Sequence, residues 1–167
     1  DANPNRNRGG QDNDPVGALA MLPLDEQGAI GWVTPTNQRD INEDHAELLR
    51  ELDLQGPPTV GGGYVYITGA RAAGRQAAYY VLAFDRRTGR LAWSSRVASE
   101  LNAESGWGGV STDATDGATL LYADGVVILL THTGAVVAVD ALRGEMLWAF
   151  KYRRQQSTSR DPWGRQT

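Results

Sequence analysis

The acidic side chains are the first residues of this sequence whose types could do chemistry. Calcium, for example, takes about six to eight oxygen ligands that converge on one point. Asp113 and Asp116 share a loop of glycine and threonine, while Glu100 and Glu104 flank an expected turn. Because the acids are scattered in this way, solvated loop carboxylates are favoured over a metal site. The sequence therefore predicts neither a catalytic residue nor a metal ligand.

Histidine, cysteine and glycine point to no chemistry either. His45 lies in an expected helix and His132 in an expected turn, and neither has a nucleophile or second ligand nearby in the sequence. Both are interpreted as surface histidines. The chain has no cysteine, which removes disulfides, thiolate metal ligands and cysteine nucleophiles. The glycine run at 61–63 opens no helix and lacks a following Lys-Ser/Thr, so it predicts a turn and not a phosphate site.

Composition and charge limit the class of protein. The chain has 167 residues, of which 41% are hydrophobic and 22% charged, so it can bury a core. A net charge of −4 and a pI near 5.1 argue against a nucleic-acid partner, which would favour a basic face. No apolar run approaches the roughly 20 residues that a membrane span needs. The chain begins at Asp1 without Met or a signal sequence, which indicates a mature form or an internal fragment.

The alternation of apolar and turn-forming segments predicts strands. Residues 40–54 carry acids early and leucines late, which predicts a short helix. Strands are predicted at 64–68, 79–85, 91–97, 119–122, 126–131, 135–140 and 146–152. Because no helix intervenes between these strands, an antiparallel all-β arrangement is expected.

One eleven-residue pattern occurs twice and is the most specific feature of the sequence. Its form is A-x-D-x-x-x-G-x-x-x-W, and all four identities recur at an offset of 55 residues (138 − 83, 140 − 85, 144 − 89 and 148 − 93). The two copies comprise Ala83, Asp85, Gly89 and Trp93, and then Ala138, Asp140, Gly144 and Trp148. Each copy ends one apolar strand and opens the next, which predicts a hairpin.

Each of the four residue types has a physical role in such a hairpin. The small alanine lets neighbouring strands approach, and the aspartate can accept hydrogen bonds from turn amides. The glycine supplies a positive φ angle. The tryptophan follows on the outgoing strand, where a buried indole needs a partner for its N–H.

This pattern resembles the tryptophan-docking motif of quinoprotein-type (PQQ-like) β-propeller repeats, over roughly residues 56–152. The resemblance implies that each blade is a four-stranded antiparallel sheet, with the motif on its outer strands. Trp93 and Trp148 would then be docking residues, mostly buried between adjacent blades. We therefore predict an all-β partial β-propeller, with two four-stranded antiparallel blades and an irregular N-terminal segment with a short helix.

The residues before the first blade fit the pattern poorly. Gly28 and Trp32 keep the spacing from glycine to tryptophan, but Leu24 stands where the aspartate is expected. The segment is either a degenerate blade or an adaptor, and the adaptor is favoured. The predicted division of the chain is a flexible arm at 1–15, this adaptor or degenerate blade at 16–55, a first blade at 56–104, a second blade at 105–152 and a linker to the next blade at 153–167.

Two blades cannot close a ring, because propellers need about 4–8 blades. The remaining blades, from the same or other chains, are therefore predicted partners. The resemblance implies an extracytoplasmic location, and we expect a non-catalytic scaffold or protein-interaction module. One alternative is part of a PQQ-dependent dehydrogenase, which would bring PQQ and calcium; another is a propeller that binds carbohydrate or the cell envelope. No cofactor is evident, and the vicinal cysteine pair of many alcohol dehydrogenases in the family is absent.

Two tryptophans lie outside the repeated pattern and are candidate contacts for a partner or ligand. Trp107 lies in a glycine-rich join between the blades, where packing is the favoured role. Trp163 lies in the polar tail beside Pro162 and Gly164, and is expected to dock on something outside this chain.

Overall fold

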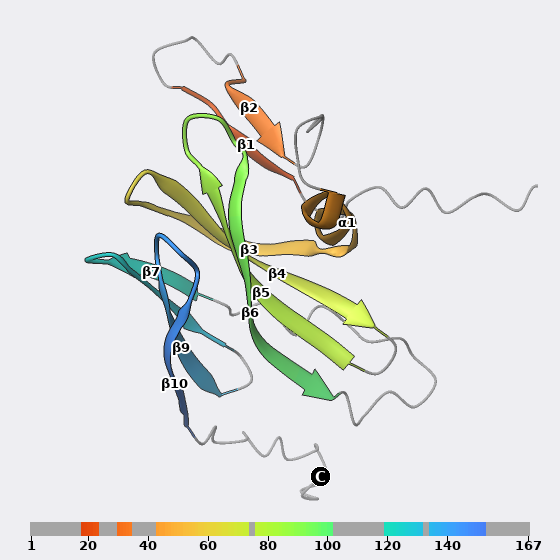
Figure 1. The fold of residues 1–167 in the computed structure, drawn as a ribbon, viewed down its shortest axis with the longest axis vertical. Helices are drawn as coiled ribbons and strands as arrows, with labels where there is room; N and C mark the ends of the chain where they lie inside the picture. Colours follow the sequence, from red (N-terminus) through yellow and green to blue (C-terminus); the bar gives the residue numbers. More distant parts are fainter. Residues whose placement is uncertain are drawn as a thin grey trace, which may run out of the picture.

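The computed structural model describes residues 18–23, 30–34, 43–73, 76–101, 119–131 and 134–152. These residues form strands and one helix, α1, at Glu43–Glu51 (Figure 1). The strands are β1 Leu19–Met21, β2 Trp32–Thr34, β3 Asp53–Gly61, β4 Tyr64–Ala73, β5 Gln76–Asp85, β6 Leu91–Leu101, β7 Thr119–Ala123, β8 Val126–Leu130, β9 Ala135–Asp140 and β10 Met146–Lys151.

Two four-stranded sheets follow one another along the chain. The first has the order β3-β4-β5-β6 and the second the order β7-β8-β9-β10, and every neighbouring pair is antiparallel. A short hairpin of β1 and β2 makes a third, two-stranded sheet. This confirms the predicted fold class, because each four-stranded sheet is a meander of the kind that forms a propeller blade. We call the two sheets the first blade and the second blade.

The innermost strand of the first blade, β3, differs from the prediction. A sequence such as Gly56-Pro57-Pro58 is typical of a break between elements, yet β3 runs through it and begins at Asp53. The pairing with β4 shifts register between Gln55 and Thr59, so the prolines lie where no ladder hydrogen bond is needed. Helix α1 ends at Glu51, three residues before the predicted end at Leu54, because β3 has already begun there.

The first blade is covered on both faces. Alternate residues of β5 point to opposite sides, so that Val81 and Ala83 face the second blade while Leu82 and Phe84 face the N-terminal hairpin and α1. All four side chains are fully buried. The hairpin contributes Leu19 and Trp32 to that second side, and α1 brings leucines beside them. A strand that is covered on both faces explains the continuous apolar sequence of β5.

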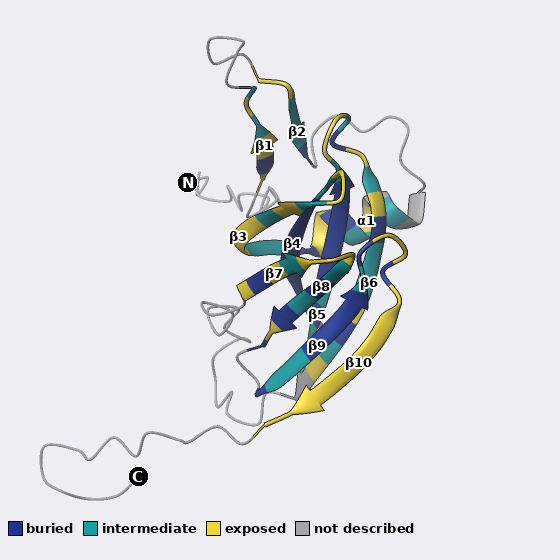
Figure 2. Cartoon of the chain, turned by 90° about the vertical axis from the view of Figure 1, so that its left-hand side faces the viewer, coloured by how far each residue is buried: buried dark blue, intermediate teal, exposed yellow. Residues whose placement is uncertain are grey.

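The second blade is covered on one face only within the part of the chain that the structure describes. In β8, Val127 and Leu129 are buried against the first blade, whereas Leu130 is exposed. The strand β10 is exposed along its whole length, as its yellow colour in Figure 2 shows. The continuous apolar sequence of β8 is typical of a strand covered on both faces, and within the described residues no sheet lies against its second face.

Candidate functional site: the contacts between blades

The two aspartates of the repeated pattern hold the turns of their own hairpins. The Asp85 carboxylate accepts hydrogen bonds from the amides of Arg87 (3.0 Å) and Thr88 (2.8 Å) and from the Thr88 hydroxyl (2.9 Å). Asp140 accepts from the amides of Leu142 (2.9 Å) and Arg143 (2.7 Å). The hydrogen bonds from Thr88 hold the pKa of the Asp85 carboxyl below its usual range. These carboxylates therefore serve the backbone of the turn.

The two glycines close the same turns. Gly89 and Gly144 donate their amides to the carbonyls of Asp85 and Asp140, each at 2.8 Å. Their φ angles of 69° and 72° lie in the left-handed region that glycine adopts without strain. One carbonyl in each turn, that of Arg86 or of Ala141, accepts a hydrogen bond from an indole of the preceding sheet.

Trp93 of the first blade lies against the turn of the second blade. Its Nε1 donates to the Ala141 carbonyl at 3.2 Å, and the side chain is only 8% exposed. The ring covers Gly144 so closely that a Cβ there would lie 2.5 Å from a ring carbon. Only glycine fits beneath the indole, so one residue satisfies both the turn and the contact between the sheets.

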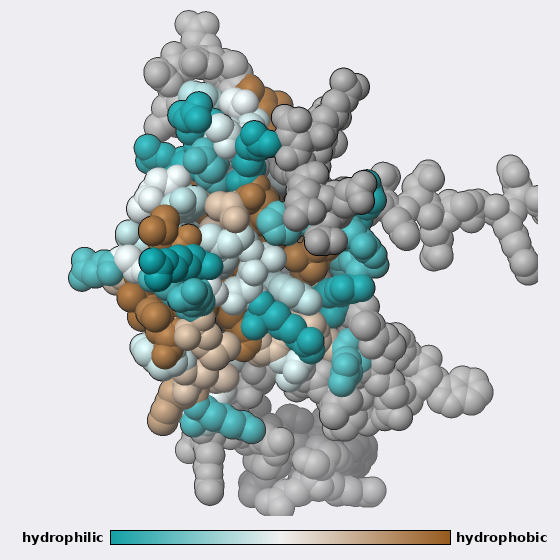
Figure 3. Space-filling view, in the orientation of Figure 1, coloured by the Kyte–Doolittle hydropathy of each residue, from teal (hydrophilic) through white to brown (hydrophobic). Residues whose placement is uncertain are grey.

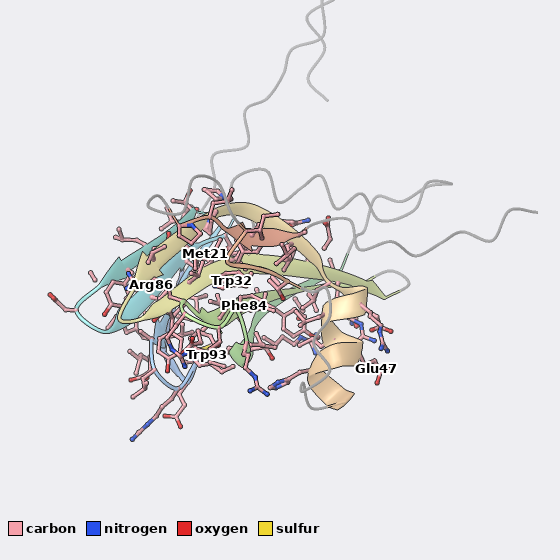
Figure 4. All side chains as sticks on the ribbon, turned by 90° about the horizontal axis from the view of Figure 1, so that it is seen from above. Met21, Trp32, Glu47, Phe84, Arg86 and Trp93 are labelled. Carbon is pink, nitrogen blue, oxygen red and sulfur yellow. The ribbon has the colours of Figure 1, made fainter. Side chains whose placement is uncertain are left out.

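Trp32 makes the same contact one sheet earlier. Its Nε1 donates to the Arg86 carbonyl at 2.8 Å, and its ring covers Gly89, where a Cβ would again lie 2.5 Å from a ring carbon. The two acceptors and the two glycines are each 55 residues apart (141 − 86 and 144 − 89). Figure 4 shows Trp32 between Met21 and Phe84, with Arg86 to one side. The β1–β2 hairpin thus presents its indole to the first blade as the outer strand β6 presents Trp93 to the second blade.

The sequence predicts that Trp148 is mostly buried, but the structure leaves it exposed. Its side chain is 48% exposed, because no sheet covers it among the described residues. Its partner on β9, Ala138, is nevertheless fully buried. The other candidates Trp107, Trp163, Asp113, Asp116, Glu104 and His132 lie outside the described residues. His45 lies in α1 and is half-buried.

The contact between the blades also uses residues that the repeated pattern does not contain. The Tyr66 hydroxyl donates to the Ala141 carbonyl at 3.1 Å, beside the indole of Trp93. Thr59 donates its hydroxyl to the Leu120 carbonyl at 2.9 Å. These residues were missed because each contact joins positions more than 60 residues apart, and neither belongs to a repeated motif.

The glycine run 61–63 forms the turn between β3 and β4, as predicted from the sequence. It also receives Tyr122 of the second blade, whose ring would collide with a Cβ at Gly61. The Tyr122 ring stacks on Tyr66 with centroids 5.8 Å apart and an interplanar angle of 10°. The Tyr122 ring of β7 therefore stacks on Tyr66 of β4 and lies on the glycine backbone at the end of β3.

The buried position of Tyr66 predicts sensitivity to alkaline pH. Burial raises the pKa of Tyr66 to about 12, from an ordinary value near 10. The folded state therefore holds the phenolic proton more tightly, and the free energy of unfolding falls as pH rises from about 10 towards 12. We expect Tyr66→Phe to be less stable than wild type at pH 8 and to recover relative to it at pH 11. Urea unfolding at the two pH values checks this; an unchanged difference between the proteins would contradict it.

Within the ranges that the structure describes, no three His, Cys, Asp or Glu side chains gather where they could hold a metal ion. No helix of the described chain is long and apolar enough to span a membrane.

Four-stranded antiparallel blades in series, with an indole of one sheet lying on the turn of the next, define a β-propeller repeat protein of the PQQ-like class. The family model described as outer membrane protein assembly factor BamB matches residues 20–163. The chain belongs to this family. The match includes both blades and all of the β1–β2 hairpin except Leu19.

The chain is similar to two solved structures. BamB from Moraxella catarrhalis is 18% identical with a TM-score of 0.45, over 83% of this chain and 39% of that one. A europium-containing methanol dehydrogenase is 23% identical with a TM-score of 0.40, over 60% of this chain and 16% of that one. The chain thus spans well under two thirds of either structure. No curated protein sequence matched it.

Proposed function

We propose that this chain is a segment of a non-catalytic, extracytoplasmic β-propeller that acts as a protein-binding scaffold in outer membrane protein assembly. The observation that carries the proposal is the family match over residues 20–163, whose description names that process. We call the polypeptide that contains this chain the parent protein. Its other blades and its assembly partners are part of the proposal.

The use of the polar groups in the repeat supports a scaffold. One carboxylate oxygen, Oδ1, of Asp85 and of Asp140 accepts the hydrogen bonds of its own turn amides, which is a structural use of both residues. The indoles of Trp32 and Trp93 donate to carbonyls of the following sheet. The indoles of Trp32 and Trp93 thus join one sheet to the next, which is a structural task.

The contact made by each indole has, in our proposal, a bracing role. The indole stacks on glycine, and this apolar contact holds neighbouring blades together. The hydrogen bond to a single carbonyl sets their relative position. A ring of blades that is braced in this way is a rigid frame, and its loops can bind other proteins. We assign this role to Trp32 and Trp93 within the chain, and to Trp148 towards the next blade.

The proposal is tested in cells that carry a tagged parent protein. We expect the tagged protein in the periplasmic or envelope fraction, co-purifying reciprocally with proteins of the outer membrane assembly pathway. Deletion of the parent gene should lower the amount of folded outer membrane proteins. As a matched control, a strain that expresses the parent with Leu142→Ala, an exposed turn position, should behave as wild type.

A different result would favour the dehydrogenase alternative. In that case the purified parent protein would take up PQQ and calcium and would reduce an artificial electron acceptor with an alcohol as substrate. Such activity, together with normal outer membrane protein levels in the deletion strain, would overturn the scaffold proposal.

A further inference from the structure

The second blade has an outward face that no described residue covers. Strand register places Leu121, Ile128, Ala138 and Trp148 in one row across this face. The next row contains Leu130, Val136 and Phe150. Leu121 is 56% exposed and Phe150 is 63% exposed. Figure 3 shows hydrophobic colouring gathered over the second blade, at the left of the view.

The first blade shows what such a face looks like when it is covered. Register places Thr59, Tyr66, Ala83 and Trp93 in the row that corresponds to Leu121, Ile128, Ala138 and Trp148. In the covered row, three side chains donate hydrogen bonds to carbonyls of the second blade. In the uncovered row, leucine and isoleucine replace the threonine and the tyrosine. Only the indole remains as a donor.

The turn beside this row differs as well. Gly61 is the residue on which the Tyr122 ring rests, and it pairs with Tyr64 at the start of β4. The residue at the same place in the second blade is Ala123, which pairs with Val126 at the start of β8. The methyl group of Ala123 occupies the position that must be empty for a ring to lie there. A partner cannot repeat the contact that Tyr122 makes.

We propose that the outward face of the second blade selects a third propeller repeat of the parent protein with defined chemistry. This repeat carries a glycine and an accepting carbonyl beneath Trp148, and a non-aromatic residue at the position that corresponds to Tyr122. The inference rests on the propeller assignment within the proposed function. It adds that the junction between the first and second blades differs in its side chains from the junction between the second blade and the third repeat. The blades can therefore stack in one order only.

A second copy of this chain does not meet the same requirements. The face of the second blade that could dock there is already buried against the first blade. The matching face of the first blade is covered by the β1–β2 hairpin and α1. An unoccupied complementary face therefore has to come from a further repeat.

The occupant is identified by photo-crosslinking in the full-length parent protein. Phe150 is replaced by p-benzoylphenylalanine, which keeps an aromatic ring at the site, and the exposed Arg96 on β6 serves as the control position. We expect the Phe150 position to crosslink within the same polypeptide, to a peptide of another repeat with the A-x-D-x-x-x-G pattern. A crosslink to a second copy or to another protein, or no crosslink in the folded parent, would overturn the proposal.

The selectivity is tested by a compensating pair of substitutions in the parent protein. The position that corresponds to Tyr122 is identified by strand register, as the inner-strand residue that pairs in the third repeat as Val60 pairs with Val65 and Tyr122 with Val127. An aromatic residue already present there in the third repeat would overturn the proposal. Otherwise, tyrosine placed there should lower the Tm by roughly 5 °C or more, and Ala123→Gly should recover over half of the loss. No recovery would show that Ala123 does not select the partner.

These experiments are independent of the assembly role. An internal crosslink together with normal outer membrane protein levels in the deletion strain would retain the junction and reject the scaffold function. A crosslink to another protein together with an assembly defect would reject the junction and retain the scaffold function.

Discussion

Trp93→Ala in the parent protein is expected to lower the free energy of unfolding by about 3–5 kcal/mol. The indole is almost completely buried, stacks on Gly144 and donates to the Ala141 carbonyl, so its loss leaves a cavity between two sheets. The free energy of unfolding of Trp93→Phe should fall between those of wild type and Trp93→Ala, because an aromatic ring remains while the hydrogen-bond donor is lost. Chemical denaturation followed by circular dichroism gives these values.

The matched control for this prediction is Leu142→Ala in the turn beside the indole. Leu142 is 65% exposed, so its truncation should change stability by no more than about 0.5 kcal/mol. A loss below about 1 kcal/mol for Trp93→Ala in the folded parent would mean that the indole does not brace the blades.

Gly144→Ala should destabilise the parent protein by about 2–5 kcal/mol. A left-handed backbone costs a residue with a Cβ about 1–2 kcal/mol. The collision of that Cβ with the Trp93 ring adds about 1–3 kcal/mol. Gly125→Ala separates the two causes, because Gly125 has a φ of 80° and no atom within 4 Å of its added Cβ.

We therefore expect Gly125→Ala to show the backbone strain alone, about 1–2 kcal/mol. The excess for Gly144→Ala should disappear when Trp93 is also replaced by alanine, which a double-mutant cycle measures. Equal losses for the two glycines in the wild-type background would show that the indole does not need a bare backbone beneath it.

The fold could be predicted from the sequence because the residues of the repeated pattern are required by the backbone of their own turns. Asp85 and Asp140 cap turns, and Gly89 and Gly144 adopt positive φ angles within four residues of them. Requirements of this kind depend on sequence neighbours, so they leave the same letters at the same spacing in each blade. The antiparallel direction of the strands followed from these hairpins, and the four strands of each blade from the resemblance.

The strand β3 and the N-terminal hairpin could not be predicted in the same way. A register shift lets β3 carry two prolines, which from sequence indicate a break. In the hairpin, Met21 pairs with Trp32 eleven positions later, whereas Ala83 pairs with Trp93 ten positions later. One added residue in the sequence between the paired positions hides the pattern, although the indole contact is the same.

The contacts between blades could be predicted only in part. The tryptophans belong to the repeated pattern, so their docking is expected from the resemblance. Tyr66, Thr59 and Tyr122 act between segments that are distant in the sequence, and their counterparts in the other blade are different residues. A residue that serves one junction alone leaves no repeat to find.

Residues 1–167 are, in our proposal, part of a larger propeller and need further blades. The outward face of the second blade leaves Leu121, Leu130, Trp148 and Phe150 exposed, which is a large apolar surface for an isolated chain. The most direct measurement expresses residues 1–167 alone and follows sedimentation velocity and thermal unfolding. We predict self-association or a broad, non-cooperative transition. A soluble monomer with one sharp transition would show a self-sufficient domain and contradict the claim.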